Sequence, residues 1–209
     1  MDCMIGIAQY PDKYFDLAVV DPPYGIGEDG LKNHSRDGVT KPTLYTQKSW
    51  DREIPAEDYF NELFRVSKNQ IIWGANHFLS KTSPCWIVWD KMNGDNDFAD
   101  CELAWTSFKT SVRKFEYRWA GMLQGDMKNK EYRIHPTQKP IQLYSWIYRK
   151  YLPEGGKVID THLGSGSNRI AADKAGNIDF VGYEIDKDYF EAQEKRWRDY
   201  KSQLVIRFD

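Results

Sequence analysis

The sequence predicts an α/β fold in which parallel strands alternate with helices. The apolar run at 17–20, followed by two prolines and a glycine, is typical of a buried strand. Residues 157–184 read as a strand, a glycine-containing turn, a helix and a second strand, the order that opens a nucleotide-binding βαβ unit. With 209 residues the chain is long enough for a sizeable core, so we expect residues 1–209 to form a single domain.

Periodicity and turn residues predict the individual elements. We expect strands at 17–20, 70–73, 85–90, 101–108, 111–119, 157–160, 179–184 and 204–209, and helices at 55–66, 141–151, from about 168 and at 186–200. Only Lys109 and Thr110 separate the strands at 101–108 and 111–119, a spacing typical of a hairpin. Residues 25–51 lack periodicity, and we expect a long loop that forms a flap after the first strand.

Composition limits the partners and the compartment. No stretch of about 18 apolar residues is present and the N-terminus lacks the pattern of a secretory signal, so we expect a cytoplasmic protein without a membrane segment. The three cysteines and four histidines lack the spacing of metal ligands, and no metal is expected. The net charge is −2, but residues 109–139 hold eight basic and three acidic side chains. This segment is either a phosphate-facing surface or an ordinary solvated face.

The tetrapeptide Asp21-Pro22-Pro23-Tyr24 after the first strand is the predicted centre of the chemistry. Proline fixes φ and donates no backbone hydrogen bond, so the Asp21 carboxylate and the Pro22 carbonyl would project as two stiff acceptors. Two such acceptors suit an NH2 group. Tyr24 offers a flat face on which a planar base can stack. The alternative is a proline-rich turn that closes a strand.

A second set of candidate residues surrounds the strand at 157–160. This strand ends in Asp160, and the turn at 164–166 contains two glycines that let a ligand approach the backbone. The next strand ends in Glu184, 24 positions after Asp160, where a carboxylate can accept both hydroxyls of a ribose. The third glycine of the dinucleotide fingerprint is missing, because position 169 is Arg.

Three motifs together resemble those of the S-adenosylmethionine-dependent DNA amino-methyltransferases, which modify adenine N6 or cytosine N4. The tetrapeptide at 21–24 is similar to the catalytic tetrapeptide of this family, and His-Pro-Thr-Gln-Lys-Pro at 135–140 is its second signature. The stretch at 160–167 resembles the pattern Asp-x-Phe-x-Gly-Ser-Gly-Thr, with His162 for Phe and Ser167 for Thr. The order of the motifs matches the circularly permuted class in which the catalytic half comes first.

The resemblance implies a Rossmann-like methyltransferase fold with a seven-stranded, mostly parallel sheet and helices on both faces. It implies S-adenosylmethionine as cofactor and DNA as partner. It divides the chain into a catalytic half at 1–119, a recognition loop at 120–134 and a cofactor-binding half at 135–209. Because the recognition loop is short, a homodimer is a further expected partner. The tail at 204–209 is expected to supply the sheet strand that is missing ahead of Asp2.

The resemblance also implies the functional residues. The implied catalytic residues are Asp21, Pro22, Pro23 and Tyr24. The implied cofactor-binding residues are Asp2, Asp21, Thr137, Lys139, Asp160, His162, Gly164, Ser165, Gly166 and Glu184.

The implied reaction is direct transfer of a methyl group to the exocyclic amine of a base that has left the helix. Adenine N6 is the expected target, because Asp at the first position of the tetrapeptide is more typical of adenine enzymes in this family and Ser of cytosine enzymes. The alternatives are N4-cytosine methylation, a nicotinamide-dependent oxidoreductase on the same kind of fold, and a non-catalytic DNA-binding relic.

Overall fold

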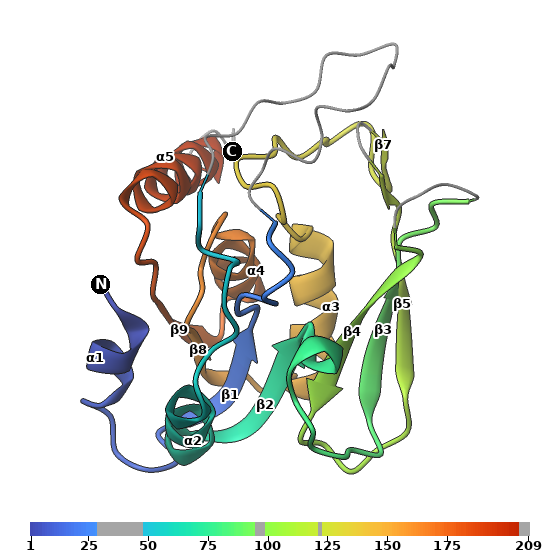
Figure 1. The fold of residues 1–209 in the computed structure, drawn as a ribbon. Helices are drawn as coiled ribbons and strands as arrows, with labels where there is room; N and C mark the ends of the chain where they lie inside the picture. The colour runs from blue at the N-terminus through green and yellow to red at the C-terminus, as the bar shows by residue number, and fades with distance from the viewer. Residues whose placement is uncertain (29–47, 95–98, 121–122, 205–209) are drawn as a thin grey trace.

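A seven-stranded sheet forms the centre of the computed structural model, which describes residues 1–28, 48–94, 99–120 and 123–204 (Figure 1). The strands lie in the order β5-β3-β4-β2-β1-β8-β9. Their bounds are β1 Phe15–Val20, β2 Ser67–Trp73, β3 Trp86–Asp90, β4 Cys101–Thr106, β5 Arg113–Glu116, β8 Gly156–Asp160 and β9 Ile178–Gly182. β4 is antiparallel to its neighbours β2 and β3, and the other pairs are parallel. A separate two-stranded ribbon consists of β6 Trp119–Ala120 and β7 Leu123–Gln124.

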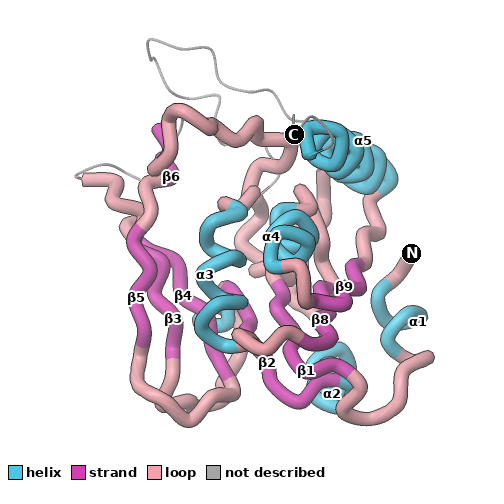
Figure 2. Tube along the Cα trace, turned by 180° about the vertical axis from the view of Figure 1, so that it is seen from behind, coloured by secondary structure: helices cyan, strands magenta, loops and turns pink. Residues whose placement is uncertain are grey.

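Helices cover both faces of the sheet, as views from opposite sides show (Figures 1 and 2). Their bounds are α1 Cys3–Ile7, α2 Glu57–Val66, α3 Ile141–Tyr151, α4 Ser167–Ala175 and α5 Lys187–Leu204, with a 3-10 helix η2 at Ala75–His77. α1 and α2 lie on one face, and α3 and α4 lie on the other. α5 packs against α4, where Arg169 pairs with Glu194 and its guanidinium lies 4.2 Å from the centre of the Trp197 ring.

β1 is apolar along its inner length because both of its faces are buried. Leu17 and Val19 pack into the cluster beneath α3 and α4, whereas Ala18 and Val20 pack into the cluster beneath α1 and α2. Successive side chains of a strand point to opposite faces, so a strand covered on both sides has to be apolar at every position. The expected buried strand at 17–20 is confirmed.

The carboxyl ends of β1, β2, β8 and β9 meet at one edge of the sheet, because these strands all run in parallel. The chain leaves β1 toward β2 on one side, while β8 pairs with β1 on the other. Ligands of open α/β sheets bind where the direction of the connections reverses in this way. The loops at 21–28, 74–77, 161–166 and 183–186 all start at this edge.

The expected α/β architecture is confirmed, but the expected hairpin of residues 101–108 with 111–119 is wrong. β4 is hydrogen-bonded to β2 on one side and to β3 on the other, so no edge of β4 remains for the next strand. β5 therefore pairs in parallel with the outer edge of β3, where Arg113 lies opposite Ile87.

Parts of two loops and of the C-terminal tail lie outside the described residues. These parts are 29–47 of the expected flap, 121–122 of the expected recognition loop, and 205–209 of the expected tail strand. Leu204 belongs to α5. Within the described ranges, no helix is long and apolar enough to cross a bilayer. The same ranges contain no group of three or more His, Cys, Asp or Glu side chains placed to hold a metal ion.

Replacing Ile147 with Ala should lower the free energy of unfolding by about 2–5 kcal/mol, because the side chain is fully buried beneath α3 and its truncation leaves a cavity. Urea unfolding followed by circular dichroism measures the change. Arg149→Ala, at an exposed position of the same helix, is the matched control and should stay within about 0.5 kcal/mol of the parent. Equal effects of the two substitutions would contradict this placement of α3.

Candidate active site

The carboxylate of Asp51 holds the loop that follows β1. Asp51 is buried, and its Oδ1 accepts hydrogen bonds from the backbone N–H groups of Tyr24 at 2.6 Å and Gly25 at 3.0 Å. Its Oδ2 accepts a hydrogen bond from the N–H of Glu28 at 2.8 Å. One carboxylate therefore satisfies three backbone donors of a loop that has left the sheet, and it fixes the backbone at the end of the tetrapeptide.

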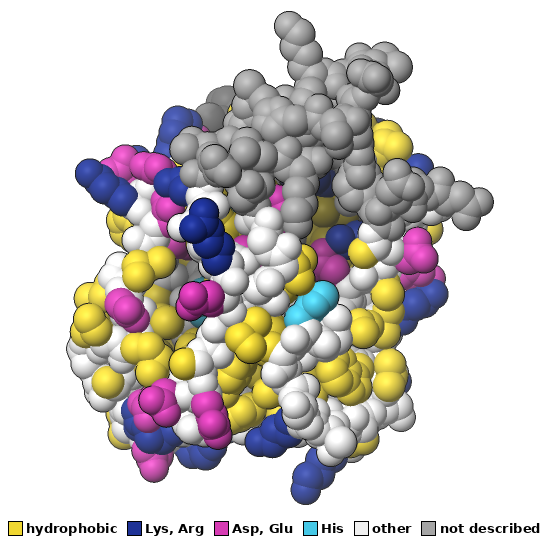
Figure 3. Space-filling model, viewed as in Figure 1, with side chains coloured by type: hydrophobic (Ala, Val, Ile, Leu, Met, Phe, Trp, Pro, Cys, Tyr) yellow, Lys and Arg dark blue, Asp and Glu magenta, His cyan; other side chains and the backbone are white. Residues whose placement is uncertain are grey.

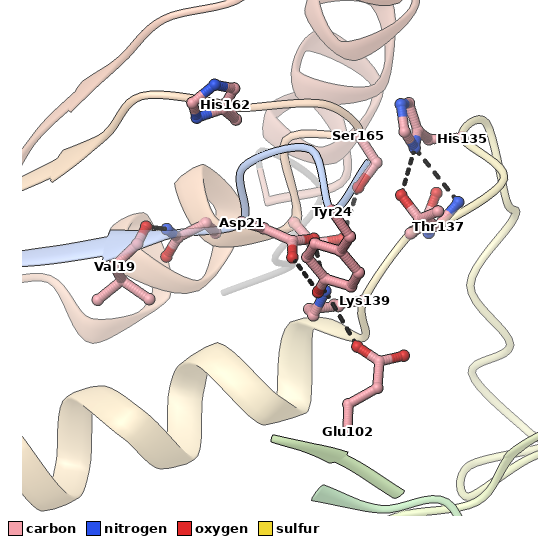
Figure 4. Close-up of polar contacts among 12 residues, drawn as sticks. Val19, Asp21, Tyr24, Glu102, His135, Thr137, Lys139, His162 and Ser165 are labelled. Carbon is pink, nitrogen blue, oxygen red and sulfur yellow. Dashed lines mark hydrogen bonds and ion pairs between the residues drawn. The ribbon is translucent and has the colours of Figure 1, made fainter. Parts of the chain in front are cut away.

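Asp21 lies directly after β1, and two donors hold its carboxylate (Figure 4). Lys139 Nζ donates to Asp21 Oδ2 at 2.5 Å, and the Tyr24 hydroxyl donates to Asp21 Oδ1 at 2.6 Å. Lys139 also donates to the Tyr24 hydroxyl oxygen at 3.2 Å. Both oxygens of Asp21 are thus oriented by charged or polar partners, and each keeps lone-pair capacity for a further donor.

A second carboxylate, from Glu102 in β4, shares the Lys139 ammonium. Glu102 Oε2 lies 3.1 Å from Lys139 Nζ, and Glu102 Oε1 lies 2.6 Å from Lys91 Nζ. Figure 4 shows the Lys139 amine between the carboxylates of Asp21 and Glu102, which reach it from different elements of the fold. Lys139 is only 3% exposed, whereas the side chains of Asp21, Glu102 and Lys91 are partly exposed. The four residues form a network of two cations and two anions with a buried lysine at its centre.

The pKa values of these groups follow from burial and from their mutual charges. Burial alone would lower the pKa of Lys139, but Asp21 and Glu102 outweigh it and raise that pKa. Burial opposes the ionisation of Glu102, yet Lys139 and Lys91 lower its pKa to about 2. Burial raises the pKa of Asp21; Lys139 counteracts this rise, and the negative charge of Glu102 adds to it.

The ring of Tyr24 is packed against the turn that follows β2. His77 stacks on Tyr24 with ring centres 5.2 Å apart and planes 15° apart. Gly74 has a φ of +65°, and a Cβ at this position would lie 2.0 Å from Tyr24 Cε1. A side chain at position 74 would therefore both strain the backbone and displace the tyrosine ring.

Asp160 joins β8 to the following turn and to α4. Its Oδ1 accepts a hydrogen bond from the N–H of His162 at 3.0 Å, and its Oδ2 accepts one from Asn168 Nδ2 at 2.9 Å. Asn168 Nδ2 also donates to the carbonyl of Val19, which ties this turn to β1 at 3.2 Å. Burial raises the pKa of Asp160 to about 7. Through these hydrogen bonds Asp160 and Asn168 connect the turn that follows β8 to the end of β1.

A pocket opens beside the ends of β8 and β9, with a volume of about 200 Å³. It is lined by Met1, Asp2, Cys3, Thr161, His162, Tyr183, Glu184 and Ile185. Glu184 Oε2 accepts a hydrogen bond from the N–H of Gly164 at 2.8 Å, and Asp2 Oδ1 accepts one from the N–H of Met4 at the start of α1. Burial lowers the pKa of His162 to about 4, which leaves its imidazole neutral at pH 7.

The structure divides the residues expected from the sequence between these two places. The first group lies at the end of β1 and consists of Asp21, Pro22, Pro23, Tyr24 and Lys139. The second group lines the pocket or lies next to it, at the ends of β8 and β9. Members of the second group are Asp2, Asp160, His162, Gly164 and Glu184. In Figure 4, His162 lies well apart from the Lys139 amine.

The three remaining expected residues lie in the turns nearest to the tetrapeptide. Thr137 is exposed, and its hydroxyl lies 3.1 Å from His135 Nδ1. Ser165 is hydrogen-bonded to the hydroxyl of Ser167 at 3.1 Å. Gly166 has a φ of +72° where α4 begins, a conformation that favours glycine.

Sequence reasoning missed Asp51, Glu102 and Asn168. Asp51 ends a polar loop and Asn168 stands inside a helix, positions at which a polar residue is unremarkable in sequence. Glu102 offers a weak signal, because it is a charged residue within a strand that is paired on both sides. Its partners Lys91 and Lys139 come from distant parts of the chain, so only the fold identifies the network.

Gly74→Ala should destabilise the protein more than Gly94→Ala does. Gly94 has a φ of +69°, and among the described residues no atom lies within 4 Å of the place that its Cβ would take. Its substitution therefore carries the backbone strain alone, about 1–3 kcal/mol. Gly74→Ala adds the clash with Tyr24. Urea unfolding measures both variants, and the near-ultraviolet circular dichroism of the tyrosines should change only for Gly74→Ala. Indistinguishable variants would contradict the packing of Tyr24 on Gly74.

Comparison with known proteins places these motifs in a family. Residues 85–195, more than half of the chain, match the family model described as DNA methylase. The type II methyltransferase M2.DpnII of Streptococcus pneumoniae is 28% identical over 148 residues, which is 71% of this chain and 48% of that protein. The chain thus spans about half the length of this relative, and the same holds for M2.LlaDCHI of Lactococcus lactis.

Solved structures share the fold. The M1.HpyAVI–SAM complex superposes with a TM-score of 0.56 at 19% identity, covering 94% of this chain and 96% of that one. The PvuII DNA methyltransferase, described as cytosine-N4-specific, has a TM-score of 0.56 at 12% identity, covering 91% of this chain and 82% of that one. These likenesses confirm a Rossmann-like methyltransferase fold. The family match, together with the order of the motifs, shows that the chain belongs to the DNA methylase family of amino-methyltransferases.

Proposed function

We propose that the protein transfers a methyl group from S-adenosylmethionine to the N6 amino group of adenine in DNA. The observation that carries this proposal is the Asp21 carboxylate at the carboxyl end of β1, held by Lys139 and by the Tyr24 hydroxyl. The next residue, Pro22, contributes a carbonyl acceptor on a stiff backbone. Membership of the DNA methylase family supports a methyl transfer and speaks against the nicotinamide-dependent alternative.

The residues around the pocket fit the nucleoside part of S-adenosylmethionine. Asp2 and Glu184 are acceptors for ribose hydroxyls or for an adenine amino group, and both line the pocket. The neutral His162 adds a planar wall without a positive charge. When bound there, the cofactor supplies a methyl group on a positively charged sulfur. In Figure 4, Ser165 lies closer to Tyr24 than His162 does, so we assign the turn that contains Gly164, Ser165 and Gly166 to the cofactor.

Asp21 and Pro22 would orient the acceptor amine. The ring of adenine delocalises the nitrogen lone pair, so this amine is a poor nucleophile. Hydrogen bonds from its two N–H groups to Asp21 Oδ and to the Pro22 carbonyl would aim the lone pair at the methyl group and hold the reacting atoms in line. An amine held in this way would donate one of its protons to Asp21 Oδ, which could accept that proton after the methyl transfer.

Tyr24 would hold the ring of the target base. A base has to leave the duplex to reach Asp21, which costs a few kcal/mol, and stacking on an aromatic ring offsets part of this cost. Gly74 and His77 keep the Tyr24 ring in a fixed plane. Thr137 belongs to the turn beside this place, and we assign it to the methionine end of the cofactor.

The segment at 109–139 is our proposed contact with DNA phosphates. Arg118, Lys128 and Lys130 are exposed in it. In the face of the molecule drawn in Figure 3, basic and acidic side chains are mixed, so the described part of this face does not form a uniformly basic surface. For this reason we assign the phosphate contacts to the segment at 109–139, which has an excess of basic residues. A homodimer that lets two short recognition loops span one DNA site stays a prediction, which sedimentation with and without DNA checks.

The choice of adenine over cytosine rests on Asp21 as the first residue of the tetrapeptide. N4-cytosine methylation is the second candidate, because the PvuII enzyme with the same fold is described as specific for cytosine N4. Both reactions use an exocyclic amine and the same pair of acceptors. They differ in the target base and therefore in the methylated product.

Incubation of the purified protein with unmethylated DNA and methyl-labelled S-adenosylmethionine, followed by nucleoside mass spectrometry, tests the function. We expect the label in N6-methyladenine. Label in N4-methylcytosine would support the proposed methyl transfer but show that the target base is cytosine. Unlabelled DNA, with cofactor binding intact in a titration, would favour the non-catalytic relic.

Asp21→Ala should reduce methyl transfer by at least about 10³-fold, because it removes an acceptor that orients the amine in the transition state. Cofactor affinity, measured by calorimetry, should stay within about threefold, because Asp21 does not line the pocket. Asp12→Ala is the control, since Asp12 is an exposed aspartate paired with Arg65 on the far side of the sheet from α3. Methyl transfer by Asp21→Ala at the parent rate would refute the role of Asp21.

A further inference from the structure

We propose that Glu102 is a positioning residue for methyl transfer, which shares the Lys139 ammonium with Asp21 and so preserves the strength of Asp21 as an acceptor. The inference rests on the proposed function, since it concerns the carboxylate assigned there to the target amine. Glu102 acts on Asp21 through the shared Lys139 ammonium, which contacts both carboxylates, and through its own negative charge. It is therefore a positioning residue and not a catalytic one.

The geometry places one ammonium between two competing carboxylates. Lys139 Nζ lies 2.5 Å from Asp21 Oδ2 and 3.1 Å from Glu102 Oε2, and it donates to the Tyr24 hydroxyl at 3.2 Å. The ammonium is hydrogen-bonded to Asp21 and Tyr24, whereas its contact with Glu102 is an ion pair without hydrogen-bond geometry. Glu102 is anchored from its other side by Lys91 at 2.6 Å. The position of Glu102 is therefore fixed independently of Asp21.

Sharing of the ammonium changes what Asp21 can offer to a substrate. If Asp21 were its sole anionic partner, the buried ammonium would neutralise that carboxylate almost completely, and the carboxylate would accept other hydrogen bonds weakly. Because Glu102 also attracts the Lys139 ammonium, the interaction of this ammonium with Asp21 is weaker than it would be without Glu102. Asp21 then keeps more negative charge for the amine of the target base and for the proton that this amine loses.

The charges around Asp21 give this effect a definite sign. Lys139 and Tyr24 face Asp21 directly, Glu102 faces it from β4, and Asp160 and Tyr144 face it from β8 and α3. After burial and Lys139, the negative charge of Glu102 is the next influence on the pKa of Asp21, and it raises that pKa. Glu102 itself is ionised at neutral pH, because its pKa is about 2. Neutralising Glu102 must then lower the pKa of Asp21.

A purely structural role for Glu102 makes a different prediction. If Glu102 served solely to balance the buried charge of Lys139, its replacement would reduce stability and the amount of folded protein. The single-turnover rate of the folded fraction and its pH profile would then stay unchanged. The rate and pH profile of the folded fraction therefore separate the two roles.

The first test measures the carboxyl of Asp21 in the cofactor-free protein. Carbon-13 NMR of protein labelled at the aspartate carboxyl, with the Asp21 signal assigned by Asp21→Asn, gives its titration curve. We expect Glu102→Gln to lower the pKa of Asp21 and Glu102→Asp to leave it closer to the parent value. The matched control is Glu62→Gln, which removes another paired glutamate on α2 and should leave Asp21 unchanged. An unchanged or raised pKa in Glu102→Gln would overturn the proposal.

The second test measures methyl transfer under single-turnover conditions across pH. Glu102→Gln should lower the plateau rate by about tenfold and move the acidic limb to lower pH, with cofactor affinity unchanged. Glu102→Asp should restore most of the rate. With Lys139→Gln in the background, Glu102→Gln should lower the rate less than it does in the parent, because the ammonium that the two carboxylates share is gone and only the direct charge effect of Glu102 remains.

The outcomes separate the inference from the function on which it rests. An inactive parent protein would refute the proposed function, whereas an active parent with Glu102→Gln equal to Glu62→Gln would refute the inference alone. Should Glu102→Gln fail to fold, Glu102→Asp decides. Its shorter side chain should lower the pKa of Asp21 and the rate by a small amount, and a pKa of Asp21 at or above the parent value would contradict the proposal.

Discussion

A lysine ammonium buried between two carboxylates ties together segments that are far apart in the chain. Lys139 precedes α3, Asp21 follows β1, and Glu102 belongs to β4, so the turn at 21–24, the motif at 135–140 and the antiparallel strand converge on one cation. Removing one partner from a buried pair usually costs about 3–5 kcal/mol, because the remaining charge stays uncompensated. The position of the Asp21 carboxylate therefore depends on long-range packing as well as on its own rigid turn.

A second network, which contains no lysine or arginine, connects the tetrapeptide to the pocket. Asn168 bonds to the Asp160 carboxylate and to the carbonyl of Val19, and the Tyr148 hydroxyl donates to Asn168. β1 and β8 are thus locked where the direction of the connections reverses. A ligand bound along the turn that follows β8 would contact the Asp21 carboxylate, which Lys139 and Tyr24 hold in a fixed position. This arrangement suits a reaction that depends on alignment of its reacting atoms.

The sequence predicts the sheet class and the candidate residues because these depend on local patterns. The apolar run before Asp21 has to be a buried strand, and the glycine turn before α4 needs a positive φ at Gly166. The order of the strands in the sheet does not follow from local sequence patterns. The segment at 113–116 could pair with β4 or with β3, and the choice depends on which strand still has an unpaired edge. Glu102 was missed for the same reason, since its partners are brought to it by that order.

A crystal structure with S-adenosylmethionine tests the central claim most directly, because it shows whether Lys139 stays with Asp21 when the cofactor is bound. The account predicts that the cofactor's nucleoside lies in the pocket by Glu184, that its methyl group points to the Asp21 carboxylate, and that Lys139 keeps its contacts with Asp21 and Glu102. A Lys139 that leaves Asp21 to bind the cofactor, or a cofactor methyl group directed away from Asp21, would contradict it.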